Sequence, residues 1–95
     1  MMAHSARQLI DSLNSRQSSK KNLGQHFLHD ERILDSIINI ASPLSESHVL
    51  EIGPGPGTLS DRLLEHSASV TAIEIDEGAC EHLAQLLPDL EVILG

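Results

Sequence analysis

The stretch from Val49 to Gly57, Val-Leu-Glu-Ile-Gly-Pro-Gly-Pro-Gly, constrains the fold of this chain more than any other. It begins as a short apolar strand, and its glycines and prolines then form a turn before a helix that starts at Thr58. Glycine permits positive φ and the close approach of a ligand, while proline stiffens the turn. Because open α/β sheets bind nucleotides at the carboxyl ends of parallel strands, this stretch predicts a nucleotide-type cofactor site.

Apolar periodicity predicts alternating helices and strands along the chain. Helices are expected at residues 6–13, between an Asp30 N-cap and Pro43, at residues 58–66, and between an Asp76 N-cap and Pro88. Strands are expected at residues 48–52, 69–75 and 90–94. The first strand is apolar enough to be covered on both faces. The pattern predicts an α/β fold in which a parallel sheet has right-handed crossovers and the first strand keeps an unpaired edge.

Charge is distributed unevenly along the chain. The net charge of the 95 residues is −8, yet residues 1–24 carry four basic side chains against one acidic one. We interpret residues 1–22 as a basic polar arm with a short helix, ending in a Ser-rich linker, and residues 23–95 as the beginning of an incomplete α/β domain. The charge of the arm suggests an anionic partner, such as phosphates contacted by Arg16, Lys20 and Lys21. Charge alone also fits a solvated, disordered terminus.

The sequence argues against several other classes of protein. The single cysteine, Cys80, rules out an internal disulfide framework. No apolar run could span a bilayer, and the first residues lack the apolar stretch of a secretory signal. His26 and His29 lack the companion ligands of a zinc site, so no metal is predicted. We therefore expect a cytoplasmic protein, and we rank an organelle transit peptide, suggested by the Ser-rich and acid-poor start, below that interpretation.

Two classes of cofactor use glycine-rich loops of this kind. Dinucleotide-binding proteins use Gly-x-Gly-x-x-Gly, but Thr58 and Ser60 stand where the third glycine is needed. Glu74 ends the second strand about 20 positions after Gly53, where an acid accepts hydrogen bonds from ribose hydroxyls. The spacing Glu-x-Gly-x-Gly-x-Gly is similar to the first motif of the S-adenosylmethionine-dependent methyltransferases. Their cofactor has no phosphate, which agrees with a loop that contains no Lys or Arg.

Residues 21–30 make the resemblance to methyltransferases more specific. This block reads Lys-Asn-Leu-Gly-Gln-His-Phe-Leu-His-Asp. With Glu-Ile-Gly-Pro-Gly at residues 51–55 and Ile-Glu-Ile-Asp at residues 73–76, it resembles the ribosomal RNA adenine N6,N6-dimethyltransferases, the KsgA-like enzymes that are related to the Erm resistance methylases. The resemblance covers residues 20–95. It implies a Rossmann-like S-adenosylmethionine methyltransferase fold, of which this chain holds the first half of the parallel sheet with flanking helices.

The resemblance also implies five cofactor-binding positions. His26 and Leu28 would contact S-adenosyl-L-methionine from the N-terminal segment. Gly53 and Gly55 would approach its methionine end through the backbone, and Glu74 would hold the ribose hydroxyls. Many relatives have Asn at the position of His26, and both side chains offer a donor and an acceptor. The implied reaction is dimethylation of adenine N6 in small-subunit ribosomal RNA, with the small ribosomal subunit as partner.

The family's catalytic motif, Asn-Leu/Ile-Pro-Phe/Tyr, does not occur in these residues and would lie beyond Gly95. The resemblance therefore implies no catalytic residue here, and we expect the 95 residues alone to be inactive. Two other functions stay open. One is a non-catalytic RNA-binding or assembly role, like that of relatives used as mitochondrial transcription factors. The other is an NAD-dependent oxidoreductase, which the absent third glycine disfavours.

Overall fold

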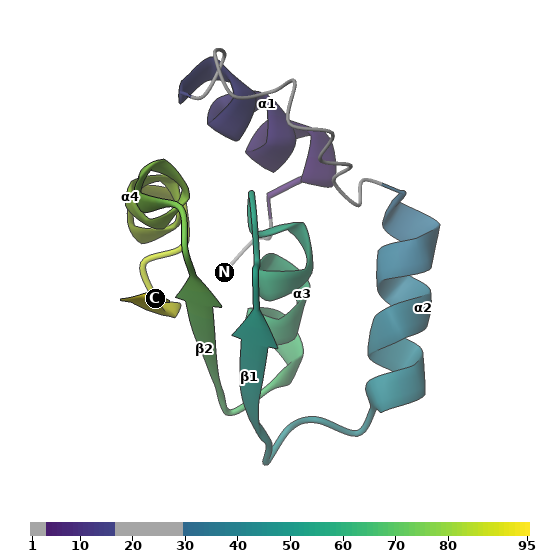
Figure 1. Cartoon of the computed structure of the whole chain (residues 1–95). Helices are drawn as coiled ribbons and strands as arrows, with labels where there is room; N and C mark the ends of the chain where they lie inside the picture. Colours follow the sequence, from purple (N-terminus) through teal and green to yellow (C-terminus); the bar gives the residue numbers. More distant parts are fainter. Residues whose placement is uncertain (1–3, 17–29) are drawn as a thin grey trace.

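The computed structural model describes residues 4–16 and 30–95. In chain order the elements are α1 (Ala6–Arg16), α2 (Glu31–Ala41), β1 (His48–Ile52), α3 (Thr58–His66), β2 (Ser69–Glu74), α4 (Glu77–Leu86) and β3 (Glu91–Leu94) (Figure 1). This order confirms the predicted α/β pattern. The differences are small: α1 runs to Arg16, into the stretch expected to be a linker, while Ile75 and Leu90 lie just outside their strands.

The N-caps of two helices explain where those helices begin. The side chain of Asp30 accepts a hydrogen bond from the backbone N–H of Arg32, at 2.9 Å. The side chain of Asp76 accepts one from the N–H of Ala79, at 3.1 Å. Each bond satisfies a backbone donor that has no partner within its helix, which confirms both predicted caps.

The three strands form a parallel sheet in the order β1-β2-β3. Their carboxyl ends therefore lie at one edge of the sheet. Figure 1 shows the arrows of β1 and β2 pointing to the same end of the molecule, where α1 lies across. Within residues 30–95 no strand pairs with the outer side of β1, as predicted.

Helices α2, α3 and α4 cover one face of this sheet. Val70 and Ala72 of β2 point toward that face and are at most 1% exposed. They belong to one apolar cluster with Ile38 of α2, Leu63 of α3 and Leu83 of α4. The core is therefore a single layer of aliphatic side chains between the sheet and the helices.

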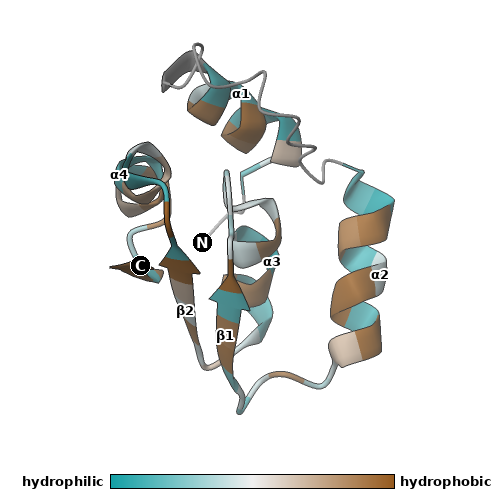
Figure 2. Cartoon of the chain, viewed as in Figure 1, coloured by the Kyte–Doolittle hydropathy of each residue, from teal (hydrophilic) through white to brown (hydrophobic). Residues whose placement is uncertain are grey.

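The opposite face is not covered by any helix of the described residues. Leu50 and Ile52 of β1 are 61% and 70% exposed. Ile52 lies in register with Ile73 of β2, and Ile73 with Ile93 of β3, so apolar residues form a row across the sheet. In Figure 2 apolar colouring covers much of β1 and β2, with a teal interruption at the arrowhead of β1. The prediction that the first strand is covered on both faces is therefore wrong for the described residues.

The hand of the chain connections explains this one-sided arrangement. The sheet grows from β1 through β2 to β3 in one direction, with α3 and α4 as the two crossovers. Right-handed crossovers that run in the same direction place their helices on the same face of a sheet. The apolar composition of β1 is typical of a strand that is buried on both faces. Periodicity along the chain does not show which helix covers the second face.

Helix α1 packs its apolar side onto α4 and α3. Its buried side chains are at most 4% exposed: Ala6, Leu9, Ile10 and Leu13. Beside them, the His4 ring forms a hydrogen bond of 3.0 Å with the carbonyl oxygen of Leu86, at the end of α4. The described part of the basic arm is therefore a docked helix and not a solvated terminus.

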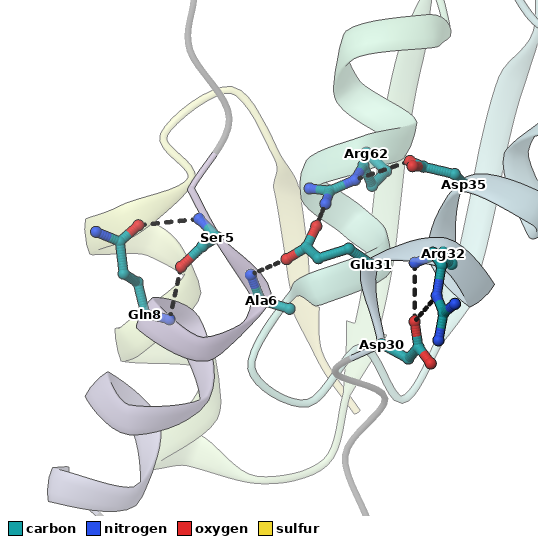
Figure 3. Close-up of polar contacts among 8 residues, drawn as sticks. All are labelled: Ser5, Ala6, Gln8, Asp30, Glu31, Arg32, Asp35 and Arg62. Atoms are coloured by element: carbon teal, nitrogen blue, oxygen red, sulfur yellow. Dashed lines mark hydrogen bonds and ion pairs between the residues drawn. The ribbon is translucent and has the colours of Figure 1, made fainter.

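A polar contact joins the starts of α1 and α2 to α3 (Figure 3). A carboxylate oxygen of Glu31 accepts a hydrogen bond of 2.8 Å from the N–H of Ala6. The other oxygen pairs with Arg62, whose Nε lies 3.6 Å from a carboxylate oxygen of Asp35. Because the Arg62 side chain is only 13% exposed, these ion pairs are less screened by water than those at an open surface.

Candidate cofactor site

The glycine-rich loop, residues 53–57, connects the carboxyl end of β1 to α3. Its three glycines, Gly53, Gly55 and Gly57, have φ angles of 68°, 57° and 91°, which confirms the predicted positive φ. Gly57 is the N-cap of α3. A Cβ atom at Gly57 would lie 2.7 Å from side-chain atoms of both Leu83 and Leu87. Close packing against α4 therefore requires this glycine, whether or not a ligand is bound.

Gly53 has a different environment. It is exposed, and a Cβ atom there would meet no heavy atom within 4 Å. Its N–H donates a hydrogen bond of 2.9 Å to the carbonyl oxygen of Ile73, which fixes the start of the loop to β2. The space above Gly53 leaves room for a ligand to approach the backbone.

Glu74, at the end of β2, lies against the same loop. Its side chain accepts hydrogen bonds from the N–H of Gly55, at 3.1 Å, and from the N–H of Asp76, at 2.9 Å. Each bond uses a different carboxylate oxygen, so each oxygen keeps further acceptor capacity. The residue is 7% exposed. The fold thus brings together Gly55 and Glu74, which the sequence analysis had assigned to one site.

Glu51 and Ser60 form a contact that the sequence analysis did not find. The hydroxyl group of Ser60, fully buried on α3, donates a hydrogen bond to a carboxylate oxygen of Glu51 on β1. Burial raises the pKa of Glu51, and the hydrogen bond from Ser60 opposes that rise only in part. One signal was available: strand alternation puts Glu51 on the same side of β1 as the apolar side chain of Val49, which indicates a partly buried carboxylate.

His82 of α4 is fully buried next to the loop. Its Nε2 atom lies 2.8 Å from the carbonyl oxygen of Pro56. The loop is therefore contacted by Glu74 from the end of β2 and by His82 from α4. No local pattern in the sequence indicated this contact, since a histidine among apolar helix positions more often fills space.

Two predicted cofactor-binding residues, His26 and Leu28, lie outside the described residues, and so do Lys20 and Lys21. Their roles stay predictions. In residues 4–16 and 30–95 no three His, Cys, Asp or Glu side chains are grouped as metal ligands would be. No helix in these two ranges has the length and apolar content needed to cross a membrane.

Two carboxylates lie beside the loop: Glu74 accepts a hydrogen bond from Gly55, and Glu51 lies on β1, the strand that leads into the loop. No Lys or Arg occurs at residues 33–61 or 63–95 of the sequence. A pyrophosphate would find no basic side chain from these segments, whereas a ligand with positive charge would be attracted. The lack of Lys and Arg in these segments therefore favours a cofactor without phosphate over a dinucleotide.

Comparison with known proteins supports this preference. The family model described as ribosomal RNA adenine dimethylase matches residues 16–94. Ribosomal RNA small subunit methyltransferase A from Salinibacter ruber is 42% identical over 73 residues, which are 77% of this chain and 25% of that protein. The protein of the same name from Erythrobacter litoralis is 51% identical over 69 residues, 73% of this chain and 25% of that one.

Solved structures show the same similarity in three dimensions. A dimethyladenosine transferase from Plasmodium falciparum superimposes with a TM-score of 0.68 and 36% identity, over 74% of this chain and 27% of that one. The 23S rRNA methyltransferase ErmE superimposes with a TM-score of 0.66 and 34% identity, over 72% of this chain and 29% of that one. The fold is therefore the Rossmann-like fold of these methyltransferases, and the chain spans about a quarter of the length of its curated relatives.

The two loop glycines predict different effects of substitution. Gly57→Ala should lower the free energy of unfolding by about 2–4 kcal/mol, because alanine is strained at this positive φ and its Cβ would overpack Leu83 and Leu87. Gly53→Ala should lower the free energy of unfolding by only about 1–2 kcal/mol, because only the positive φ is unfavourable there. Its main effect should be weaker cofactor binding. Urea unfolding and titration calorimetry would separate the two. Equal losses of stability would contradict the different environments described for these glycines.

Glu51 predicts a pH-dependent change in stability. Its pKa is raised by burial from the ordinary value of 4.5, so folding favours the protonated form. The resulting stability is present below about pH 4.5 and is lost as the pH rises through the folded-state pKa. Glu51→Gln, which cannot ionise, should therefore melt above the unsubstituted protein at pH 7, with the difference shrinking toward acid pH. Exposed Glu46→Gln is the control, and an equal pH trend in both variants would contradict the assignment.

Proposed function

This chain belongs to the ribosomal RNA adenine dimethylase family, and we propose that it is the cofactor-binding N-terminal part of an enzyme that dimethylates adenine N6 in small-subunit ribosomal RNA. Relatives named ribosomal RNA small subunit methyltransferase A support this assignment. The family's catalytic motif does not occur in the 95 residues. The activity is therefore proposed for the complete enzyme, and these residues alone are expected to be inactive.

The observation that carries the proposal is the contact between Glu74 and the glycine-rich loop. The carboxylate is held by backbone N–H groups of Gly55 and Asp76, and its free acceptor positions lie at the carboxyl edge of the sheet. An acid at this place in a Rossmann-like fold accepts hydrogen bonds from ribose hydroxyls. The open backbone at Gly53 lies at the same edge, at the end of β1.

S-adenosyl-L-methionine, when bound, supplies a methyl group on a positively charged sulfur. The protein's part is then to bind and to orient. We assign the ribose hydroxyls to Glu74 and the methionine end to the backbone at Gly53 and Gly55. His26 and Leu28 would complete the site from the segment before α2. Orientation of this kind would hold the methyl donor toward the adenine nitrogen, which would first be exposed from its RNA context.

Ribosomal RNA of the small subunit is the proposed partner, and the cytoplasm the proposed compartment. The proposed phosphate contacts come from Arg16, Lys20 and Lys21 in the basic arm. Helix α1 ends at Arg16 and lies across the carboxyl edge of the sheet in Figure 1.

Substitution of Glu74 tests the cofactor assignment. Glu74→Ala removes the ribose acceptor and should weaken S-adenosyl-L-methionine binding by about 1.5–3 kcal/mol, the range for hydrogen bonds to charged groups. The dissociation constant from titration calorimetry is the measurement. Glu77→Ala, an exposed acid in the first turn of α4, is the matched control. Equal affinity in the Glu74→Ala variant and the unsubstituted protein would sink the assignment. Tight competition by NAD would favour the oxidoreductase alternative.

Charge reversal in the arm tests the RNA partner. The double variant Lys20→Glu, Lys21→Glu should weaken RNA binding by the complete enzyme. The plot of log affinity against log salt, which falls as salt rises, should become less steep by about 2, one for each phosphate that is no longer neutralised. Filter binding across a salt series would measure both quantities. An unchanged slope would remove the arm from the RNA interface. Cofactor and RNA binding without methyl transfer by the complete enzyme would favour the non-catalytic alternative.

A further inference from the structure

His82 is a buried polar side chain that bonds the glycine-rich loop. It is 0% exposed and neighbours Leu83, which is also fully buried on α4. Its Nε2 atom lies 2.8 Å from the carbonyl oxygen of Pro56. Because a carbonyl oxygen only accepts hydrogen bonds, Nε2 must carry a proton and act as the donor.

Within residues 4–16 and 30–95, few other groups bond the backbone of the loop. Pro54 and Pro56 have no N–H to donate. The N–H groups of the first and third glycines donate to backbone carbonyls, in β2 and in the loop itself. Within the described residues, two side chains bond the loop backbone: Glu74 at Gly55, and His82 at Pro56. These bonds hold adjacent residues from two different elements, β2 and α4.

We propose that His82 is a positioning residue, which fixes the shape of the loop for cofactor binding; this inference rests on the proposed function. The bond to Pro56 restrains the second half of the loop, and the restricted backbone of proline passes that restraint to Gly55. Gly55 in turn donates to the carboxylate of Glu74. His82 therefore acts on the ribose acceptor through the loop and touches no ligand.

Other roles of a buried histidine fit less well. A metal ligand needs companion ligands, and none are grouped suitably in residues 4–16 and 30–95. A general acid or base must reach the reacting group, but His82 has no exposed surface. A residue that only fills space would not need a donor directed at a loop carbonyl. The hydrogen bond is thus the feature that a role for His82 must explain.

Two variants of the native protein separate positioning from packing. His82→Leu removes the donor, and His82→Gln keeps an amide N–H at a similar reach. The dissociation constant for S-adenosyl-L-methionine should rise about fivefold to twentyfold in His82→Leu, the effect of leaving a buried carbonyl without its bond. It should return to within about twofold of the unsubstituted value in His82→Gln.

A control variant accounts for a general loss of stability. Ala84→Gly lies on the exposed side of α4 and weakens the helix without contacting the loop. It should lower the melting temperature yet leave the dissociation constant unchanged. Equal weakening of binding in Ala84→Gly and His82→Leu would overturn the proposal, and so would unchanged binding in His82→Leu.

Amide hydrogen exchange at Gly55 gives a readout that needs no cofactor. Exchange should accelerate in His82→Leu and not in Ala84→Gly, since only the first variant releases the loop. Unchanged exchange in His82→Leu would overturn the positioning role. A complete lack of cofactor binding by the unsubstituted protein would instead overturn the proposed function, while selective exchange at Gly55 would still support His82 as the residue that holds the loop.

Discussion

The candidate site depends on one buried carboxylate, that of Glu74. Its oxygens accept hydrogen bonds from the backbone N–H groups of Gly55 in the loop and of Asp76 at the start of α4. Burying a carboxylate is costly unless hydrogen bonds replace the water that it loses. Here the backbone supplies those bonds before any ligand arrives. The same group thus joins β1, β2 and α4 at the sheet edge and presents its spare acceptor positions there.

Helix α4 supports this arrangement. It contributes the donor of His82 and the side chain of Leu83, and Gly57 packs without a Cβ atom against Leu83 and against Leu87, the residue that follows the helix. It also receives α1, whose apolar side is buried on it. A single short helix therefore has three neighbours: the loop, the sheet and the N-terminal helix. This shared support explains why the stiff sequence Gly-Pro-Gly-Pro-Gly can be held in one shape.

Most of the fold could be predicted from the sequence because its signals are local. Apolar periodicity, the caps Asp30 and Asp76, and the glycine-proline turn all act within a few residues of the boundaries they set. Contacts between distant residues were missed, as with Ser60 and Glu51 or His82 and Pro56. Periodicity shows that a side chain points inward, but it does not identify the partner. The resemblance to a family joined Gly55 and Glu74 to one ligand, which periodicity alone could not do.

The unpaired outer edge of β1 has a consequence for the position of the site. A strand that paired there would extend the sheet in the opposite direction, and a right-handed connection would carry its helix over Leu50 and Ile52. Where the order of strands reverses in this way, neighbouring loops diverge to opposite faces and leave a crevice between them. In a sheet extended in this way β1 would be the topological switch point, and Gly53, exposed at its carboxyl end, would lie at the crevice.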